Sequence, residues 1–284
     1  MFDFFKRFRK FKEKLKQRSI IIMGYPGSGT EYRRIPEYDT MKFLVQKIDG
    51  KIVHDFAFEL IRSKDYYDWL DEPMSVSYTD DLSFRNLSNP EGLVPVGSVE
   101  FVSEFLRRFF PSSASSLRPL NVPEDLFSFA GRKIANVYKR EDFATFRNLD
   151  ELYRKSLDTI KSQFNGPVYD IQKSYEAKDF RGFQISELIN VVSEWRAFIF
   201  DGKILHIANY AGDCLSFPNP DTIKEMVRTY KSAPSVYTLD VAVKDSGETV
   251  VIECHRFFSC GLYGFSDYRR LPIMLTRAWK EMIR

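Results

Sequence analysis

The chain has 284 residues, of which 44% are hydrophobic and 29% charged, as is typical of a soluble globular protein of one or two domains. No apolar run approaches the roughly 18 residues needed to cross a bilayer, and the charged N-terminus shows no secretory signal, so we expect neither a membrane-spanning nor an exported protein. Three cysteines exclude a disulfide framework, and a net charge of +3 gives no reason to expect nucleic acid as a partner. We therefore expect a cytoplasmic location.

Basic charge is concentrated in residues 1–18, which hold eight basic residues against two acidic ones. Phe4, Phe8, Phe11 and Leu15 recur at helical spacing, so a basic amphipathic helix is predicted over 1–19. Such a helix can lie on an anionic membrane surface or grip a protein partner. Alternatively, it docks on its own domain and keeps its lysines in water. Both interpretations stay open.

The next segment contains Gly24, Gly27 and Gly29 after a short apolar stretch. A phosphate-binding loop needs a lysine after its last glycine, followed by serine or threonine. Thr30 and Glu31 stand in those places, so a glycine-rich turn after a buried strand is the better interpretation.

Between residues 41 and 122, two strands and one helix are predicted. Strands at 41–49 and 51–62 are joined by the turn Asp49-Gly50. A helix over 98–110 begins at the N-cap Ser98 and ends before Pro111, and residues 111–123 read as a linker. The buried face of this helix is predicted to consist of Phe101, Val102, Phe105, Leu106 and Phe109. The linker divides an N-terminal α/β domain, 20–122, from a second domain, 123–284.

The second domain is predicted to mix hairpins and short helices, which indicates an α+β fold. Asp201-Gly202 and Asp245-Ser246-Gly247 are turn signals, and Asn219-Pro220 is a helix start. The expected elements are a helix at 149–163, strands at 168–173 and 183–189, a hairpin of 194–200 with 203–210, a helix from 220 that buries Ile223, Met226, Val227 and Tyr230, and a hairpin of 236–243 with 248–254.

The last hairpin carries two acids that bear on function. If Val243 faces Glu248 across the turn, one face of the hairpin is wholly apolar, and Asp240 and Glu253 share the other face as diagonal neighbours. If the strand continues, His255 follows on that second face. The apolar face then consists of Leu239, Val241, Val243, Val250 and Ile252. The neighbours of the two carboxylates on their face are few and mostly uncharged, so a divalent cation such as Mg²⁺ would remove their repulsion. An exposed face that merely carries two acids is the alternative.

Other candidate groups lie upstream of this hairpin. Lys173 ends one predicted strand and Lys178 lies in the following turn, where both can hold phosphates as point charges beside Gly182. Alternation places Glu194 and Arg196 on one face of a strand and Trp195 on the other. Arg196 then binds a phosphate or a substrate carboxylate, or it forms a structural ion pair beside a core tryptophan.

A zinc site built from Cys254, His255 and Cys260 is disfavoured. Their spacing is irregular, no fourth ligand is evident, and Cys254 falls on the apolar face of the hairpin.

The order of these motifs resembles the ATP-grasp superfamily. It is Lys173, Lys178-x-Phe180-x-Gly182, Ser193-Glu194-Trp195-Arg196, Asp240, Glu253-x-His255 and Gly261-Leu262-Tyr263. The sequence looks most similar to a divergent clade common in bacteriophage genomes, in which a lysine replaces a usual arginine. The resemblance covers most of residues 40–265. It implies two α+β subdomains that clasp ATP, preceded by a small α/β domain, and a host-cytoplasmic location if the protein is viral.

The resemblance also implies residue roles. Lys173 and Lys178 contact ATP phosphates, Glu187 lies where the hinge meets adenine and ribose, and Arg196 stabilises the transferred phosphoryl group. Lys178 and Arg196 are therefore the expected catalytic residues, and Asp240 and Glu253 the expected Mg²⁺ ligands. His255 stands where the family usually has asparagine, so it points either to a softer metal such as Mn²⁺ or to a residue that does not ligate and a reduced activity.

The implied activity is ATP-dependent ligation of a carboxylate to an amine through an acyl phosphate. The partners are then an acid and an amine acceptor, with free amino acids, peptides and proteins all open, and nucleic acid not expected. The glycine-rich loop of other members is reduced here to Gly182. A catalytically degenerate protein that binds nucleotide or acts as a structural partner, and a kinase that uses the same site, are the alternatives.

Overall fold

The computed structural model describes residues 41–69, 73–80, 82, 84, 87–138, 152–157, 166–167, 182–258 and 260–284, together with the strand pair β1 (Ile20–Ile21) and β2 (Tyr32–Arg33). Within this part of the chain the fold is α+β, as predicted, with one parallel and two larger antiparallel sheets. The basic segment 1–18, the glycine-rich turn near residue 27, and the strand expected at 168–173 lie outside the described residues. None of the described helices is long and apolar enough to cross a membrane.

The N-terminal part is built on a three-stranded parallel sheet. Its strands are β3 (Met41–Gln46), β4 (Met74–Thr79) and β5 (Val94–Val96), in the order β4-β3-β5. Parallel neighbours need crossover connections, and α2 (Asp55–Trp69) lies between β3 and β4, while the short 3-10 helix η2 (Pro90–Gly92) precedes β5. Four of the six residues of the central strand β3, Phe43 to Gln46, are buried in succession, as expected of a strand covered on both faces.

The prediction of a strand at 51–62 is wrong, because helix α2 occupies most of that range. The turn itself is present. Ile48 and Lys51 exchange backbone hydrogen bonds around Asp49 and Gly50, which both have positive φ angles. The chain then enters a helix instead of a second strand. The buried residues of this helix follow a helical period: Phe56, Ala57, Leu60, Ser63 and Tyr67.

The predicted helix after Ser98 is confirmed as α3 (Val99–Phe109). The Ser98 hydroxyl accepts a hydrogen bond from the Phe101 backbone N–H, and all of the predicted apolar face except Phe109 is buried. The following segment is not an open linker. Residues 111–116 form the 3-10 helix η3 (Pro111–Ser116), and Val122 near the end of the segment is buried. A further 3-10 helix, η4 (Glu124–Phe129), follows the segment.

The second half contains a four-stranded antiparallel sheet of order β11-β10-β12-β13. Its strands are β10 (Val191–Phe200), β11 (Lys203–Gly212), β12 (Val236–Lys244) and β13 (Thr249–Arg256). Both predicted hairpins are confirmed, and Asp201 and Gly202 both adopt positive φ, as their two-residue turn requires. Helix α5 (Pro220–Thr229) begins at Asn219, whose side chain caps two backbone N–H groups. Helix α5 and η4 cover one face of this sheet, against Trp195, Leu239 and Val241.

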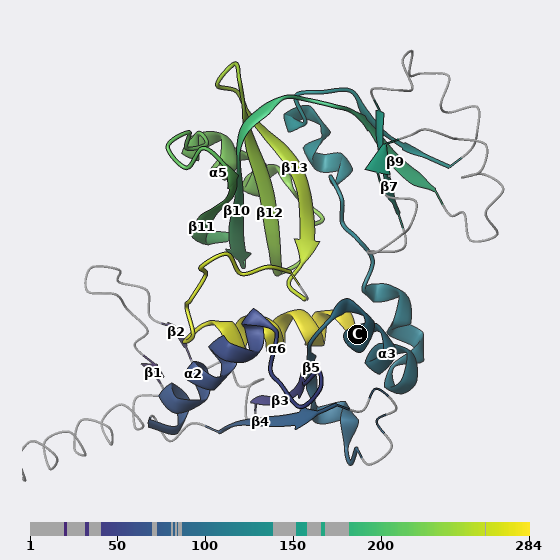
Figure 1. Ribbon diagram of the computed structural model, residues 1–284, viewed down its shortest axis with the longest axis vertical. Coiled ribbons are helices and arrows are strands. Elements are labelled where there is room, and N and C mark those ends of the chain that lie inside the picture. Colours follow the sequence, from purple (N-terminus) through teal and green to yellow (C-terminus); the bar gives the residue numbers. More distant parts are fainter. Residues whose placement is uncertain are drawn as a thin grey trace, which may run out of the picture.

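A further antiparallel sheet has the order β6-β9-β7-β8. It comprises β6 (Ile134–Val137), β7 (Leu152–Ser156), β8 (Gly166–Pro167) and β9 (Phe183–Glu187). The prediction of a helix at 149–163 is wrong over residues 152–156, because β7 pairs with β9 along its whole length. Strand pairing thus overrides the local helical pattern there. Figure 1 shows β7 and β9 on the side of β13, which is an edge strand of the sheet β11-β10-β12-β13.

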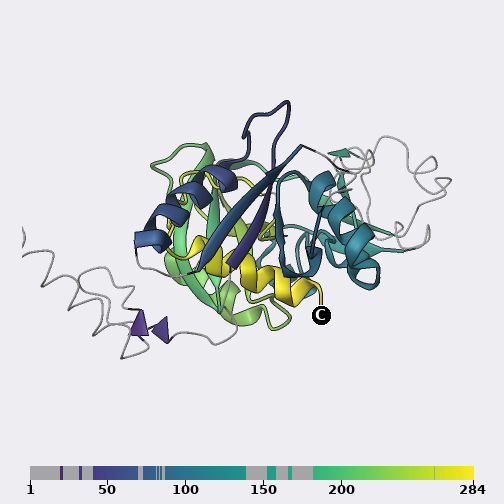
Figure 2. The ribbon, with the colours of Figure 1, turned by 90° about the horizontal axis from the view of Figure 1, so that it is seen from below.

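The C-terminal helix α6 (Leu271–Met282) joins the two halves of the molecule. It packs against β3 and β5 of the parallel sheet and against β12 of the four-stranded sheet, between which it lies in Figure 1. The view from below shows the same helix next to the strands of the parallel sheet (Figure 2). The core around it includes Phe198, Phe200 and Phe257 from one end of the four-stranded sheet. The other end of that face carries polar side chains.

The register of the last hairpin differs from the prediction. Lys244 N–H donates to the Glu248 carbonyl around a three-residue loop closed by Gly247 at φ +82°, so Val243 pairs with Thr249 and not with Glu248. A bulge between Val241 and Asp240 then shifts the pairing by one more residue. As a result Asp240 lies directly opposite Glu253 and not diagonal to it. Val250 and Ile252 do not belong to the apolar face, where Val251 and Cys254 stand instead.

Candidate functional site

Arg196 and Asp240 form a buried ion pair in the middle of the four-stranded sheet. They are direct neighbours on β10 and β12. Arg196 Nε donates to Asp240 Oδ1 at 2.8 Å and Nη2 donates to Oδ2 at 2.7 Å, while Nη1 donates to the Gly261 carbonyl at 3.0 Å. Only 6% of the Arg196 side chain and 1% of the Asp240 side chain are exposed. This two-pronged geometry fixes the planes of both groups.

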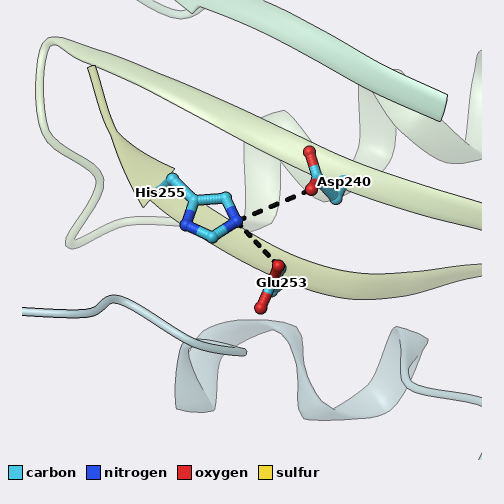
Figure 3. A group of neighbouring side chains, drawn as sticks. All are labelled: Asp240, Glu253 and His255. Carbon is cyan, nitrogen blue, oxygen red and sulfur yellow. Dashed lines mark hydrogen bonds and ion pairs between the residues drawn. The ribbon is translucent and has the colours of Figure 1, made fainter. Parts of the chain in front are cut away.

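Glu253 lies beside this pair and has two cationic partners. Its Oε1 receives a hydrogen bond from His255 Nε2 at 2.7 Å, and its Oε2 pairs with the Lys155 ammonium, which comes from β7 of the neighbouring sheet. His255 Nε2 also lies 3.6 Å from Asp240 Oδ2. Figure 3 shows the imidazole reaching both carboxylates from the end of β13. Lys155 is thus a direct link between the two antiparallel sheets.

Burial and charge shift the pKa values of this cluster in opposite directions. Burial alone would raise the pKa of Glu253, but the hydrogen bond from His255 and the charge of Lys155 outweigh it, so the pKa lies well below its usual range. Burial alone would lower the pKa of His255, yet its bonds to Asp240 and Glu253 raise it to about 9. At neutral pH the cluster therefore holds ionised Glu253 and protonated His255.

The expectation that the two carboxylates have mostly uncharged neighbours is wrong. Arg196 neutralises Asp240, and Lys155 and His255 neutralise Glu253. Sequence alternation correctly places Asp240, Glu253 and His255 on one face. Besides His255 itself, the compensating cations come from β10 and from another sheet. A metal ion is therefore not needed to relieve repulsion in the ligand-free protein.

The same three side chains nevertheless fit a divalent cation. Asp240, Glu253 and His255 each offer one ligand atom, and these atoms lie within 4.8 Å of one another. Two carboxylate oxygens suit Mg²⁺, and an imidazole nitrogen suits Mn²⁺ better. Because His255 is protonated at neutral pH, it ligates only after losing its proton.

Glu194 on β10, Tyr210 on β11 and Tyr263 in the turn after β13 extend the site. The Tyr210 hydroxyl donates to Glu194 Oε2 at 2.6 Å, and its ring stacks on Tyr263 with 5.0 Å between centroids. The Arg196 guanidinium lies 4.9 Å from the Tyr263 ring centre and 5.7 Å from that of Tyr210. As predicted, Glu194 and Arg196 share a face, and Trp195 packs into the core on the opposite face.

The remaining predicted site residues are not part of this cluster. Glu187 ends β9, where its carboxylate accepts a hydrogen bond from the Lys133 backbone N–H at 2.9 Å, and its side chain is exposed. Lys173 and Lys178 lie outside the described residues. Their expected roles stay predictions.

Three residues of the site escaped the sequence analysis as functional groups. Lys155 lay in a stretch expected to be helical, so its strand position was not recognised. No motif identifies Tyr210, although alternation along β11 places its side chain on the face that carries Glu194. Tyr263 was part of the motif Gly261-Leu262-Tyr263, but nothing in that motif indicates a contact with Arg196.

The candidate metal group found among the described residues contains no cysteine. Cys254 is fully buried in the core beneath the sheet, as expected from its place on the apolar face. Burial raises the pKa of Cys260 to about 12, so its thiol stays protonated.

A protein-family model matches half of the chain. The model of the ATP-grasp domain of the arginine-to-lysine clade, family 2, matches residues 129–271, which is just over half of the 284 residues. This range contains β6 to β13 and all of the residues in the charged cluster. No protein of curated function matches the sequence.

Solved structures share the fold at low identity. N5-carboxyaminoimidazole synthetase from Staphylococcus aureus is similar with a TM-score of 0.50 and 11% identity, over 84% of this chain and 77% of that one. D-alanine–D-alanine ligase from Bacillus anthracis gives a TM-score of 0.48 and 13% identity, over 86% and 99%. The ATP-grasp ligase PsnB, complexed with a minimal precursor, gives 0.49 and 12%, over 84% and 100%. At such identity the first similarity bears on the fold alone, and no argument rests on the other two.

Proposed function

Since this chain belongs to family 2 of the arginine-to-lysine clade of ATP-grasp domains, we propose that it is an ATP-dependent ligase that joins a carboxylate to an amine through an acyl phosphate. The family typically uses ATP and Mg²⁺. The proposal takes ATP, an acid and an amine acceptor as its substrates, the acceptor being a free amino acid, a peptide or a protein.

One observation carries this proposal. Asp240 and Glu253 face each other on neighbouring strands, with Arg196 beside them and a second sheet opposite. A divalent cation held by the two carboxylates, together with the neighbouring guanidinium, would supply positive charge where negative charge spreads over phosphoryl oxygens. No side-chain nucleophile is required, because the acid substrate itself attacks the phosphate.

We assign the divalent cation to Asp240 and Glu253, with His255 as the third ligand once it is neutral. A bound cation would supply positive charge to the phosphate oxygens of ATP. We further assign Lys173 and Lys178 to the phosphates and Glu187 to adenine and ribose, on the basis of the family resemblance.

The reaction has two steps. An oxygen of the substrate carboxylate attacks the γ-phosphorus, a new C–O–P linkage forms, and the bond from γ-phosphorus to the bridging oxygen breaks to release ADP. The nitrogen of the amine then attacks the acyl carbon, phosphate leaves with the carboxylate oxygen, and the amine loses a proton. Arg196 and Lys178 stabilise the charge of the first step.

An oxygen-labelling experiment tests the sequence of bonds. Full-length protein is given ATP, Mg²⁺ or Mn²⁺, an acid with ¹⁸O in its carboxylate, and an amine. We expect ADP release that depends on both substrates and one ¹⁸O atom in each phosphate released. A kinase would release no phosphate from a phosphorylated acid, and a protein that only binds nucleotide would release no ADP. Either result would overturn the proposal.

Matched variants assign the activity to the cluster. Glu253→Gln keeps the shape of the side chain and removes the charge, and we expect at least about a hundredfold loss of turnover. Glu248→Gln, at the exposed tip of the same hairpin, is the control and should keep full activity. Equal turnover in both variants would count against the proposed site.

A further inference from the structure

Tyr263 stands over the guanidinium of Arg196 in an unusual backbone conformation. Its φ angle is +44°, in the left-handed region that non-glycine residues seldom adopt. Its ring is 46% exposed, so burial of apolar surface does not explain why the chain holds it there. Strained residues of this kind persist where the surroundings fix them, often at functional sites.

Gly261, two residues before Tyr263, leaves space for the tyrosine ring because it has no side chain. A Cβ atom on Gly261 would lie 2.7 Å from Tyr263 Cζ, closer than real Cβ contacts allow. The carbonyl of the same glycine accepts the hydrogen bond from Arg196 Nη1. One tight turn therefore supplies both a backbone acceptor and an aromatic ring to the same guanidinium.

A second ring, that of Tyr210, lies against Tyr263 and is also close to the guanidinium. Tyr263 stacks on Tyr210 with an angle of 22° between the ring planes, and the Tyr210 hydroxyl is anchored on Glu194. The Arg196 guanidinium lies 4.9 Å from the Tyr263 centroid, within the range of a cation–π contact. Asp240 fixes two guanidinium nitrogens, and Gly261 and Tyr263 constrain the remaining edge and face.

We propose that Tyr263 is a positioning residue that keeps Arg196 oriented for phosphoryl transfer, with Tyr210 and Glu194 as its support. The inference rests on the proposed function for its kinetic consequence only, because the orientation of Arg196 can be measured without turnover. Positioning errors of about 1 Å can lower a rate by a hundredfold. The aromatic ring makes the contact that orients Arg196, and the Tyr263 hydroxyl is not needed for this role.

The kinetic experiment compares Tyr263→Phe with Tyr263→Leu in the full-length protein. Loss of the ring in the leucine variant should lower kcat about tenfold and leave the KM for ATP within about twofold, because Arg196 acts on the transferred group. The phenylalanine variant should stay within about twofold of the wild type. Gly261→Ala, which pushes the ring aside, should lower kcat in the same way.

Tyr78→Leu is the matched control. Tyr78 is 42% exposed, and Lys47 Nζ lies 4.9 Å from its ring centre, but it belongs to β4 of the parallel sheet. This variant should keep the wild-type kcat. An equal fall of kcat in Tyr78→Leu, wild-type kcat in Tyr263→Leu, or a phenylalanine variant as slow as the leucine variant would each overturn the proposal.

A spectroscopic measurement separates this inference from the proposed function. The Nη1–H signal of Arg196, from the nitrogen that donates to the Gly261 carbonyl, is identified in ¹⁵N NMR by its loss in Arg196→Lys. We expect it to be protected from exchange with water in the wild type and in Tyr263→Phe, and to lose that protection in Tyr263→Leu. Unchanged protection in Tyr263→Leu would overturn the positioning role, whether or not the protein ligates. Absence of ligation in the wild type would overturn only the proposed function.

Discussion

The ion pair of Arg196 and Asp240 shows what a buried pair contributes at the scale of single residues. Desolvation of two charges offsets most of their attraction, so such a pair stabilises a fold only weakly. Its two parallel N–H···O bonds instead fix how both groups point. In this site the pair holds one carboxylate of the candidate metal ligands in a single orientation.

A pH dependence follows from His255 in metal-free protein. The imidazole pKa is raised from 6.5 to about 9 in the folded state, by Asp240 and Glu253 against the opposing effect of burial. Its stabilising contribution is therefore complete below pH 6.5 and is lost as pH rises from 6.5 to about 9. We expect the free energy of unfolding, measured with urea in the presence of a chelator, to fall across this window more than in His255→Asn. Parallel pH profiles of the two proteins would contradict this.

Strand alternation predicts the faces of the site residues but not their partners. Asp240, Glu253 and His255 share a face because side chains alternate along β12 and β13, and this is visible in the sequence. Lys155 cannot be found in that way, since it reaches Glu253 from a sheet whose strands do not pair with β13. Contacts between sheets leave no periodic signal along the chain.

At the scale of elements, the hairpin of β12 and β13 shows why register is harder to predict than strand identity. Val250, Val251 and Ile252 are consecutive and all apolar, so alternation alone cannot decide which of them face the core. The turn and the bulge decide it. The strand prediction over most of α2 is wrong for a related reason. Phe58, Ile61 and Trp69 are large apolar residues on the exposed side of the helix, and they hide its amphipathic pattern.

Gly131 gives a prediction at this scale. It has φ +62°, and a Cβ atom there would lie 2.4 Å from Val250 Cγ1 on β13. Gly131→Ala should therefore cost about 1 kcal/mol for the backbone conformation and a further 1–3 kcal/mol for overpacking. Gly202→Ala, with φ +72° and open space around the position, should show the backbone cost alone. Urea unfolding of the two variants measures the difference, and equal losses would refute the clash.

At the scale of the whole molecule, α6 connects segments that are far apart in the chain. Trp279 on this helix is 2% exposed, and its ring contacts Phe105, Phe110 and Phe258. It thereby ties α3 to the end of the four-stranded sheet. Helices α3 and α5 and the two hairpins of the four-stranded sheet are predictable from local patterns. The packing of α6 joins residues more than 170 positions apart and has no local signature.

Removal of this tryptophan should destabilise both halves together. Trp279→Ala leaves a large cavity in the shared core, and we expect a loss of about 3–5 kcal/mol in the free energy of unfolding. Trp69→Ala is the control, because Trp69 is 51% exposed, and we expect it to cost about 1 kcal/mol or less. Unfolding is followed by tryptophan fluorescence and by circular dichroism. Separate transitions for the two probes, or equal losses in both variants, would contradict a common core.

The short stretch at Asn121 and Val122 is hydrogen-bonded to both antiparallel sheets. The Asn121 carbonyl accepts a hydrogen bond from the Cys254 N–H on β13 at 2.6 Å, and the Gln184 side chain on β9 bonds both the N–H and the carbonyl of Val122. The side-chain amide of Gln184 therefore makes the same two hydrogen bonds with Val122 that the backbone of a paired strand would make. A displacement of one sheet relative to the other keeps these hydrogen bonds only if it rotates about this stretch. The displacement would then be greatest in the parts of the two sheets farthest from residue 122.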